Sequence, residues 1–247
     1  MKRLNATRQQ RIAGLVSVGI LAMVVYITGS VFEWQLYNDS TKNASSHAKS
    51  VVTKALEPSA KTPAQNQKSL LVAADELVTD ESTCQPTWWI RWQTIFPSLN
   101  DMVKSCEVSV AKQTALKIEL DKVNMFLADE QHVAIIINRL PSTDTTLTDK
   151  TWDTTITKWT SVSTDLASYK SSDDYQPVIV VLRTQTNKAL SAWKEIKAAD
   201  KKQNKQGYEA AYDKLDQAVT GMIAAADKSD AALKILLAKA TIAAQKL

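Results

Sequence analysis

The feature that most constrains the fold of this chain is its shortage of glycine. Only five glycines occur in 247 residues, and none lies between residues 30 and 206. Hairpin turns and bulges in β-sheets need backbone conformations that glycine adopts most readily. A stretch of this length without glycine therefore favours long helices joined by few turns.

The spacing of apolar side chains supports this interpretation. After residue 97 they recur every three to four positions, which is the period of an α-helix. A first helix is predicted to begin just after Pro97 and to end near Pro141. Polar residues interrupt its apolar stripe at Ser109, Gln113 and Glu130. We expect a helix of up to about 40 residues, or roughly 60 Å in length.

Three further helical segments follow the first. The segment from 152 to 169 is rich in threonine, which favours strands, but Trp152, Ile156 and Trp159 keep the helical period. The next begins after residues 171 to 174, although the apolar run 178 to 182 by itself would also suit a buried strand. The last runs from about 208 to 240, with a break expected at residues 227 to 230, where Ser229 could cap a separate C-terminal helix.

The N-terminal segment indicates a membrane anchor. Residues 12 to 32 form an uncharged, apolar run whose helix would span roughly 30 Å, the thickness of a bilayer core. Four basic residues and no acid precede this run, which places the N-terminus in the cytoplasm and the rest outside it. We therefore expect an all-α chain, with a transmembrane helix followed by an elongated antiparallel bundle of four to five long helices.

Two other interpretations of this segment stay open. A cleaved signal peptide has a shorter apolar run and ends in a small-x-small site, which this segment lacks. A pilin-like leader would be removed after Gly14 and would leave Leu15 as the first residue, but Gly19 stands where pilins generally carry glutamate. The mature N-terminal residue would distinguish these interpretations.

Composition divides the chain into five parts. Residues 1–11 form a basic cytoplasmic tail, and residues 12–32 form the anchor. Residues 33–56 suit a polar helical stalk, and residues 57–68, with two prolines and few apolar side chains, suit a linker. Residues 69–247 would form the extracytoplasmic bundle.

The two cysteines, Cys84 and Cys106, both fall in the predicted outer part. An oxidising compartment would let them form a disulfide, contributing about 3 kcal/mol by closing a loop of roughly 22 residues. Two buried free thiols are the competing interpretation.

Composition and motifs argue against several kinds of chemistry. The whole chain carries a net charge of +4, of which residues 1 to 37 account for +3, so the rest shows no nucleic-acid footprint. Neither His47 nor His132 has another His or Cys at metal-ligand spacing in the sequence, and no glycine-rich phosphate loop occurs after the anchor. We expect no enzyme activity, no metal, no cofactor and no nucleic-acid partner.

The most unusual stretch is the aromatic segment from 87 to 96. As a helix it would place Trp88 and Trp92 on one face, with Trp89 and Phe96 beside them and Arg91 pointing elsewhere. It could plug one end of the bundle, lie on the outer leaflet, or bind a protein partner, since Trp and Arg are enriched at binding hot spots. These five residues are the candidate interface patch.

One short stretch has a family resemblance. Residues 96 to 99, Phe-Pro-Ser-Leu, followed by Val103 and Lys104, resemble the I-P-x-L…V-K stretch of LemA-type membrane-anchored helical proteins. The likeness covers fewer than a dozen residues and ends at the aromatic segment, so we assign the chain to no family.

These observations lead to one functional expectation with an alternative. We expect a single-pass, non-enzymatic surface protein, held in the lipid bilayer, that serves as a structural or protein-binding element of an envelope assembly, with a protein partner or as a homo-oligomer. The alternative is an extracytoplasmic sensory or ligand-binding bundle. A pocket lined by Trp152, Trp159 or Trp193 together with a convergent polar group would favour the alternative.

Overall fold

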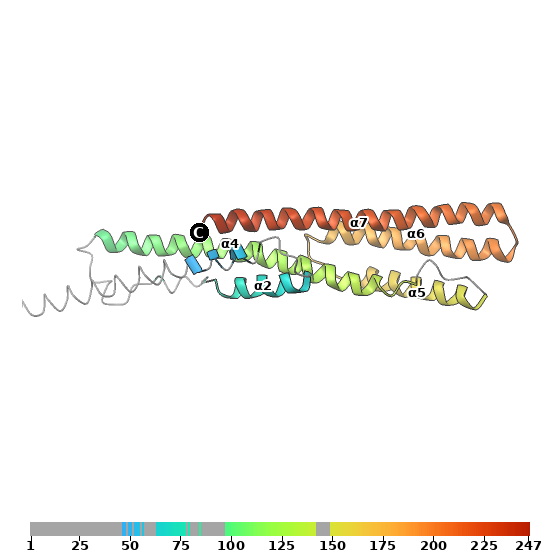
Figure 1. Cartoon of the computed structure of the whole chain (residues 1–247), viewed down its shortest axis with the longest axis horizontal. Coiled ribbons are helices and arrows are strands. Elements are labelled where there is room, and N and C mark those ends of the chain that lie inside the picture. Colours follow the sequence, from blue (N-terminus) through green and yellow to red (C-terminus); the bar gives the residue numbers. More distant parts are fainter. Residues whose placement is uncertain are drawn as a thin grey trace, which may run out of the picture. The chain divides into compact units, whose positions relative to one another are not determined.

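The computed structural model describes residues 46–47, 49–50, 52–54, 56, 63–77, 79, 84, 97–141 and 149–247. Every regular element in these ranges is a helix, as the glycine shortage predicted. The main helices in chain order are α2 (Pro63–Asp75), α4 (Pro97–Ile137), α5 (Asp149–Ser168), α6 (Gln176–Lys201) and α7 (Lys205–Gln245) (Figure 1).

Among the residues that the structure describes, no helix is long and apolar enough to span a lipid bilayer. The predicted anchor, residues 12–32, lies outside these residues, as does the aromatic segment with Trp88, Trp89, Arg91, Trp92 and Phe96. The anchor and its orientation therefore stay predictions from the sequence.

The chain divides into two compact units, and α4 contributes to both. The first unit includes residues 77 to 114, where Cys84 and Cys106 form a disulfide with 5.6 Å between their Cα atoms. Both cysteines are buried together with Val110. The pairing predicted from the sequence is thus confirmed.

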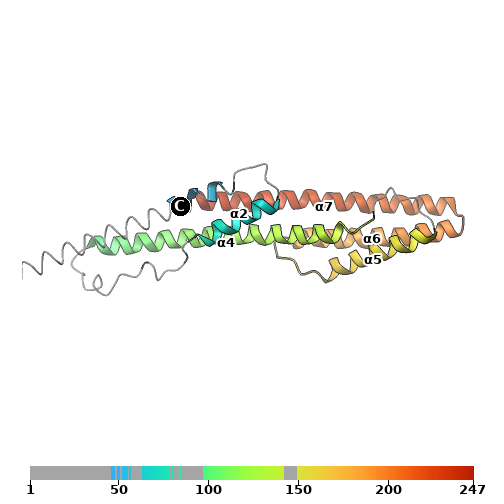
Figure 2. The same cartoon turned by 60° about the horizontal axis from the view of Figure 1, so that its bottom comes forward.

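The second unit contains residues 51 to 76 and 115 to 246. Within it, α6 and α7 run antiparallel side by side, and α5 packs against α6 (Figures 1 and 2). Their apolar stripes bury Trp152, Trp159 and Trp193 among small alanine side chains of α6 and α7. Helix α2 joins this unit, where the Gln67 side-chain amide donates to the carbonyl oxygen of Asn124 at 3.3 Å.

Prolines and one asparagine mark the helix starts. Pro63 and Pro97 are the first residues of α2 and α4, where a missing N–H costs nothing because the first turn has no acceptor for it. Helix α2 thus begins within the stretch 57–68 that composition suits to a linker. Asn204 caps α7, since its side-chain oxygen accepts from the Gly207 N–H at 3.1 Å.

Two alternatives from the sequence are wrong. The run 178 to 182 is helical rather than a strand, because Val178 and Leu182 lie one turn apart on the buried face of α6. Helix α7 continues without a break through residues 227 to 230. Ser229 does not cap a separate helix there, because it is buried and its hydroxyl donates to Glu130.

Candidate functional site: a groove beside α4, α6 and α7

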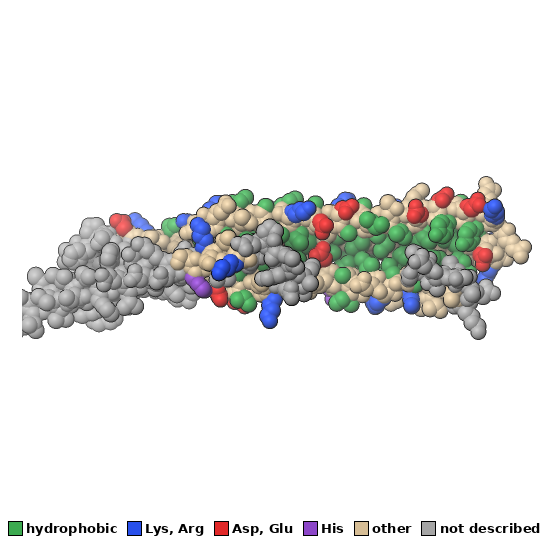
Figure 3. Space-filling view, viewed as in Figure 1, with side chains coloured by type: hydrophobic (Ala, Val, Ile, Leu, Met, Phe, Trp, Pro, Cys, Tyr) green, Lys and Arg blue, Asp and Glu red, His purple; other side chains and the backbone are tan. Residues whose placement is uncertain are grey.

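The second unit contains a groove of about 480 Å³, within the range of small-molecule binding sites. Helices α4, α6 and α7 supply most of its lining, and α5 adds Trp159. The lining side chains are mainly apolar: Val133, Ala134, Ile137, Leu140, Pro141, Trp159, Val178, Leu182, Val219, Met222, Ile223 and Ala226, with Glu130, Asn138, Tyr175 and Ser229 as the polar members. Apolar side chains gather in a band alongside α7 in the space-filling view (Figure 3).

Helical periodicity explains why these residues share one groove. Glu130, Val133 and Ile137 lie three and four residues apart on α4, so they face the same direction. Val219, Met222 and neighbouring lining residues keep the same spacing on α7. Each helix therefore contributes one continuous face rather than scattered side chains.

Three polar side chains meet at one end of the groove. The Ser229 hydroxyl donates to Glu130 Oε1 at 2.9 Å, joining residues 99 positions apart in the sequence. Burial raises the pKa of Tyr175 to about 12, with a further contribution from the Glu130 carboxylate, while a hydrogen bond with Ser229 acts in the opposite direction. The Tyr175 phenol is therefore neutral at physiological pH and offers a hydrogen bond.

A buried carboxylate next to Glu130 holds this end of the groove in place. Asp129 accepts from the Tyr169 hydroxyl at 2.5 Å, and from the Ser172 backbone N–H and hydroxyl at 2.9 and 2.5 Å. Asp129 belongs to α4, whereas Tyr169 and Ser172 belong to the connection between α5 and α6. This set, which we call the Asp129 junction, fixes the connection that leads into Tyr175.

Aromatic packing reinforces the junction. The His132 ring stacks on Tyr169 at a centroid distance of 4.5 Å, and Phe126 meets Tyr175 edge to face at 5.0 Å. Burial, followed by the hydrogen bond to Asp129, raises the pKa of Tyr169 well above its usual value. Tyr169 thus stays protonated and keeps donating to Asp129 at physiological pH.

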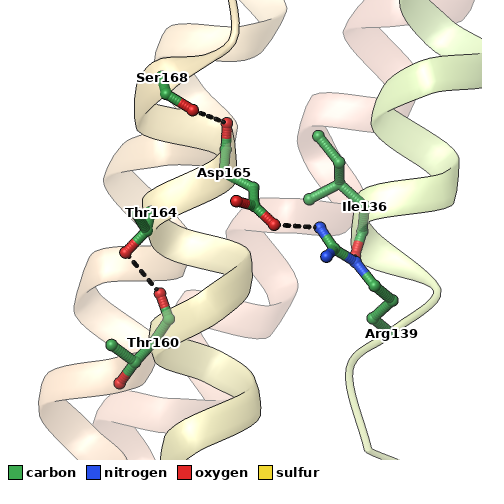
Figure 4. Close-up of polar contacts among 6 residues, drawn as sticks. All are labelled: Ile136, Arg139, Thr160, Thr164, Asp165 and Ser168. Carbon is green, nitrogen blue, oxygen red and sulfur yellow. Dashed lines mark hydrogen bonds and ion pairs between the residues drawn. The ribbon is translucent and has the colours of Figure 1, made fainter.

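Two arginines tie the helix ends near the groove. The Arg183 guanidinium donates to the carbonyl oxygens of Leu166, in the last turn of α5, and of Tyr169, just after α5. Arg139, just beyond α4, pairs with Asp165 of α5 at 2.5 Å (Figure 4). Because the Arg139 and Asp165 side chains are 47% and 42% exposed, their pair contributes little to stability and mainly orients the chain.

Trp159 lines the groove and has a buried indole N–H without a partner in the described part of the chain. Its side chain is buried at 4% exposure, and its indole N–H has no hydrogen-bond partner among the described residues. Buried donors are nearly always paired in folded proteins, so an unpaired one in the wall of a groove is unusual. Trp193 carries a second unpaired indole N–H in the same apolar core.

The sequence anticipated part of this site. From the sequence we expected that a pocket lined by Trp152, Trp159 or Trp193 would favour ligand binding, and Trp159 lines the groove. We interpreted Glu130 only as a polar interruption of the apolar stripe of the first predicted helix. A charge at that position, in register with Val133 and Ile137, was the available signal. The candidate patch at residues 88 to 96 lies outside the described residues, so it stays a prediction.

Within the described ranges, no group of three or more His, Cys, Asp or Glu side chains is placed to hold a metal ion. No protein family, curated protein or solved structure significantly resembles this chain.

Proposed function

We propose that this chain is a membrane-anchored, extracytoplasmic helical protein without enzyme activity whose bundle binds a small apolar molecule. The groove carries this proposal, because an apolar lining of about 480 Å³ ends in three convergent polar side chains, Glu130, Tyr175 and Ser229. Apolar walls with a few placed polar groups are the usual composition of a small-molecule site. The membrane anchor and its orientation come from the sequence.

The groove favours the ligand-binding alternative over a purely structural role. A structural helix bundle needs only apolar contacts between its helices, whereas this one leaves an apolar groove in which Glu130, Tyr175 and Ser229 are polar lining residues. A role within an envelope assembly is compatible with ligand binding and remains part of the proposal. Affinity purification of the full chain from its native membrane would test the assembly role, and recovery of the chain alone would count against it.

The ligand-binding role is tested by filling the groove from opposite walls. Ala134 of α4 and Ala226 of α7 both line the groove and are both exposed, so leucine at either site adds volume there without crowding the core. Leucine also suits a helix. Matched controls are leucine at Ala128 of α4 and at Ala224 of α7, which are exposed but do not line the groove.

The measurement is the affinity of 1-naphthalenemethanol for the full-length chain in phosphatidylcholine nanodiscs, by isothermal titration with empty nanodiscs as the blank. We expect Ala134→Leu and Ala226→Leu each to weaken binding about tenfold, because the added side chain displaces the probe. The two control variants should stay within about twofold of the wild type. Equal binding by all five proteins, or no binding above the blank, would contradict the proposal.

A further inference from the structure

The charges around the groove indicate which kind of molecule it would hold. Among its described lining residues, Glu130 is the one charged side chain, and none is Lys, Arg or His. Asp129, the residue immediately before Glu130 in the chain, adds a second carboxylate close by. The two arginines of the second unit are engaged elsewhere, since Arg183 binds backbone carbonyls and Arg139 pairs with Asp165.

The Glu130 carboxylate has capacity for a further donor. A carboxylate offers about four acceptor positions, and the Ser229 hydroxyl fills one of them. The Glu130 side chain is only half-buried, so a molecule in the groove can reach it. Asp129 differs, because it is 7% exposed and its oxygens already accept three hydrogen bonds from the α5–α6 connection.

Resting on the proposed ligand-binding function, we propose that the groove selects an amphipathic cation, an apolar body that carries an ammonium group. The ammonium would bind Glu130, and the apolar body would lie against Val133, Val178 and Met222. Ammonium-to-carboxylate hydrogen bonds are about twice as strong as neutral ones, so the charge supplies selectivity that the apolar walls cannot. Tyr175 and Trp159 belong to the aromatic types that attract alkylammonium groups.

Anions are disfavoured by the same arrangement. A carboxylate or sulfate in the groove would face the Glu130 carboxylate, and no described lining residue offers a positive charge. A neutral molecule would bind through apolar contact and hydrogen bonds, but without the attraction between an ammonium and the Glu130 carboxylate. The expected order of affinity is therefore cation, then neutral molecule, then anion.

Three probes with the same apolar body test this order: 1-naphthylmethylamine, 1-naphthalenemethanol and 1-naphthoate. Their affinities are measured by isothermal titration at pH 7 on the full-length chain in phosphatidylcholine nanodiscs, with empty nanodiscs as the blank. For the wild type we expect the amine to bind about tenfold more tightly than the alcohol, and the carboxylate to bind most weakly.

Glu130→Gln removes the charge and keeps an oxygen that can accept from Ser229. We expect it to weaken binding of the amine about tenfold and to weaken binding of the alcohol clearly less, so that the preference for the amine disappears. Binding of the neutral alcohol also reports that the variant is folded. Asp227→Asn is the matched control, because Asp227 is exposed on α7 and does not line the groove.

Glu130→Lys provides a second variant and should reverse the order, with 1-naphthoate binding more tightly than the amine. Equal affinity of the wild type for amine and alcohol, or an unchanged amine affinity in Glu130→Gln, would overturn the cation proposal. If Ala226→Leu still weakened all three probes, the groove itself would stand as a binding site. If Ala226→Leu weakened none of them, the proposed function would fail as well.

Discussion

Two contacts of different chemistry hold α5 and the connection that follows it. The first half of α5 packs against α6 through tryptophan side chains, whereas the connection after α5 is bound to α4 through the buried carboxylate of Asp129. In the first region, which we call the tryptophan core, the Trp152 and Trp193 rings meet edge to face at 5.8 Å among alanines of α6 and α7. The indole N–H of Trp193 has no partner among the described residues. In the Asp129 junction, three hydrogen bonds converge on one side chain.

The difference between the two regions lies in what each can specify. Apolar burial is non-directional and roughly proportional to area, so the tryptophan core contributes stability but fixes the helices only through shape. Hydrogen bonds to Asp129 need particular donors at particular distances, so the junction fixes the register between α4 and the α5–α6 connection. Glu130 follows Asp129 on α4, and Tyr175 follows Ser172 in the connection. The junction therefore also fixes the positions of Glu130 and Tyr175 relative to each other at the polar end of the groove.

The largest expected effect is at the tryptophan core. Trp193→Ala removes a side chain that is 6% exposed and leaves a cavity, so we expect a loss of about 3–5 kcal/mol in the free energy of unfolding. Tyr212→Ala on α7 is the control, because Tyr212 is 51% exposed and should cost less than about 1 kcal/mol. Urea unfolding followed by circular dichroism measures both. Equal losses in the two variants would mean that the tryptophan core does not hold the unit together.

The Asp129 junction should show a smaller loss of stability with a sharper structural effect. Asp129→Ala leaves the Tyr169 hydroxyl and the Ser172 N–H and hydroxyl without their acceptor, and we expect a loss of about 2–3 kcal/mol. The variant should also weaken 1-naphthalenemethanol binding, because the groove end loses its register.

Asp230→Ala is the matched control for the junction, since Asp230 is an exposed acid on α7. Its free energy of unfolding should stay within about 0.5 kcal/mol of the wild type. If Asp129→Ala lowered stability but left probe affinity unchanged, the junction would act as ordinary packing and the comparison between the two regions would collapse.

Alkaline pH should affect the Asp129 junction and not the tryptophan core, because Tyr175 beside the junction has a raised pKa. Its pKa is about 12 in the native state, against about 10 in an unfolded chain. Between these values the native state holds a proton that the unfolded state has released, so stability is unaffected below pH 10 and falls as the pH rises towards 12.

Unfolding of the wild type and of Tyr175→Phe, measured from pH 8 to 12, tests this expectation. The variant should lose less stability than the wild type over the upper two pH units, because it lacks the group that ionises late. Absorbance at 295 nm should show one tyrosine fewer ionising near pH 12 in the variant. Parallel pH profiles of the two proteins would contradict the assignment of a raised pKa to Tyr175.

The sequence predicted the helices and the disulfide but not the polar contacts between helices. The spacing of Trp152, Ile156 and Trp159 predicted α5 correctly although its threonine content favours a strand, because residues on the buried face of a helix recur every three to four positions. The contact between Ser229 and Glu130 joins residues 99 apart, and spacing along one helix says nothing about its register with another. Ser229 was therefore interpreted as a helix cap, although it lies inside an unbroken α7.

The smallest effect concerns the turn between α6 and α7, close to the tryptophan core and remote in sequence from the junction. Gln203 adopts a left-handed backbone conformation with φ of 51°, and the Asn204 N–H donates back to the Ala199 carbonyl oxygen at 2.9 Å. Glycine adopts this conformation without a steric penalty, so Gln203→Gly should stabilise the chain by about 0.5–1 kcal/mol. Lys202→Gly should instead destabilise by a similar amount, because Lys202 has φ of −91° and glycine there only adds unfolded-state entropy. Opposite signs for the two variants in thermal unfolding, with probe affinity unchanged in both, would show that the stability of the tryptophan core can be raised without a change at the Asp129 junction.

A loss of probe affinity in Gln203→Gly would instead show that the two regions are coupled through α7. That result would contradict the view that the tryptophan core and the Asp129 junction act separately.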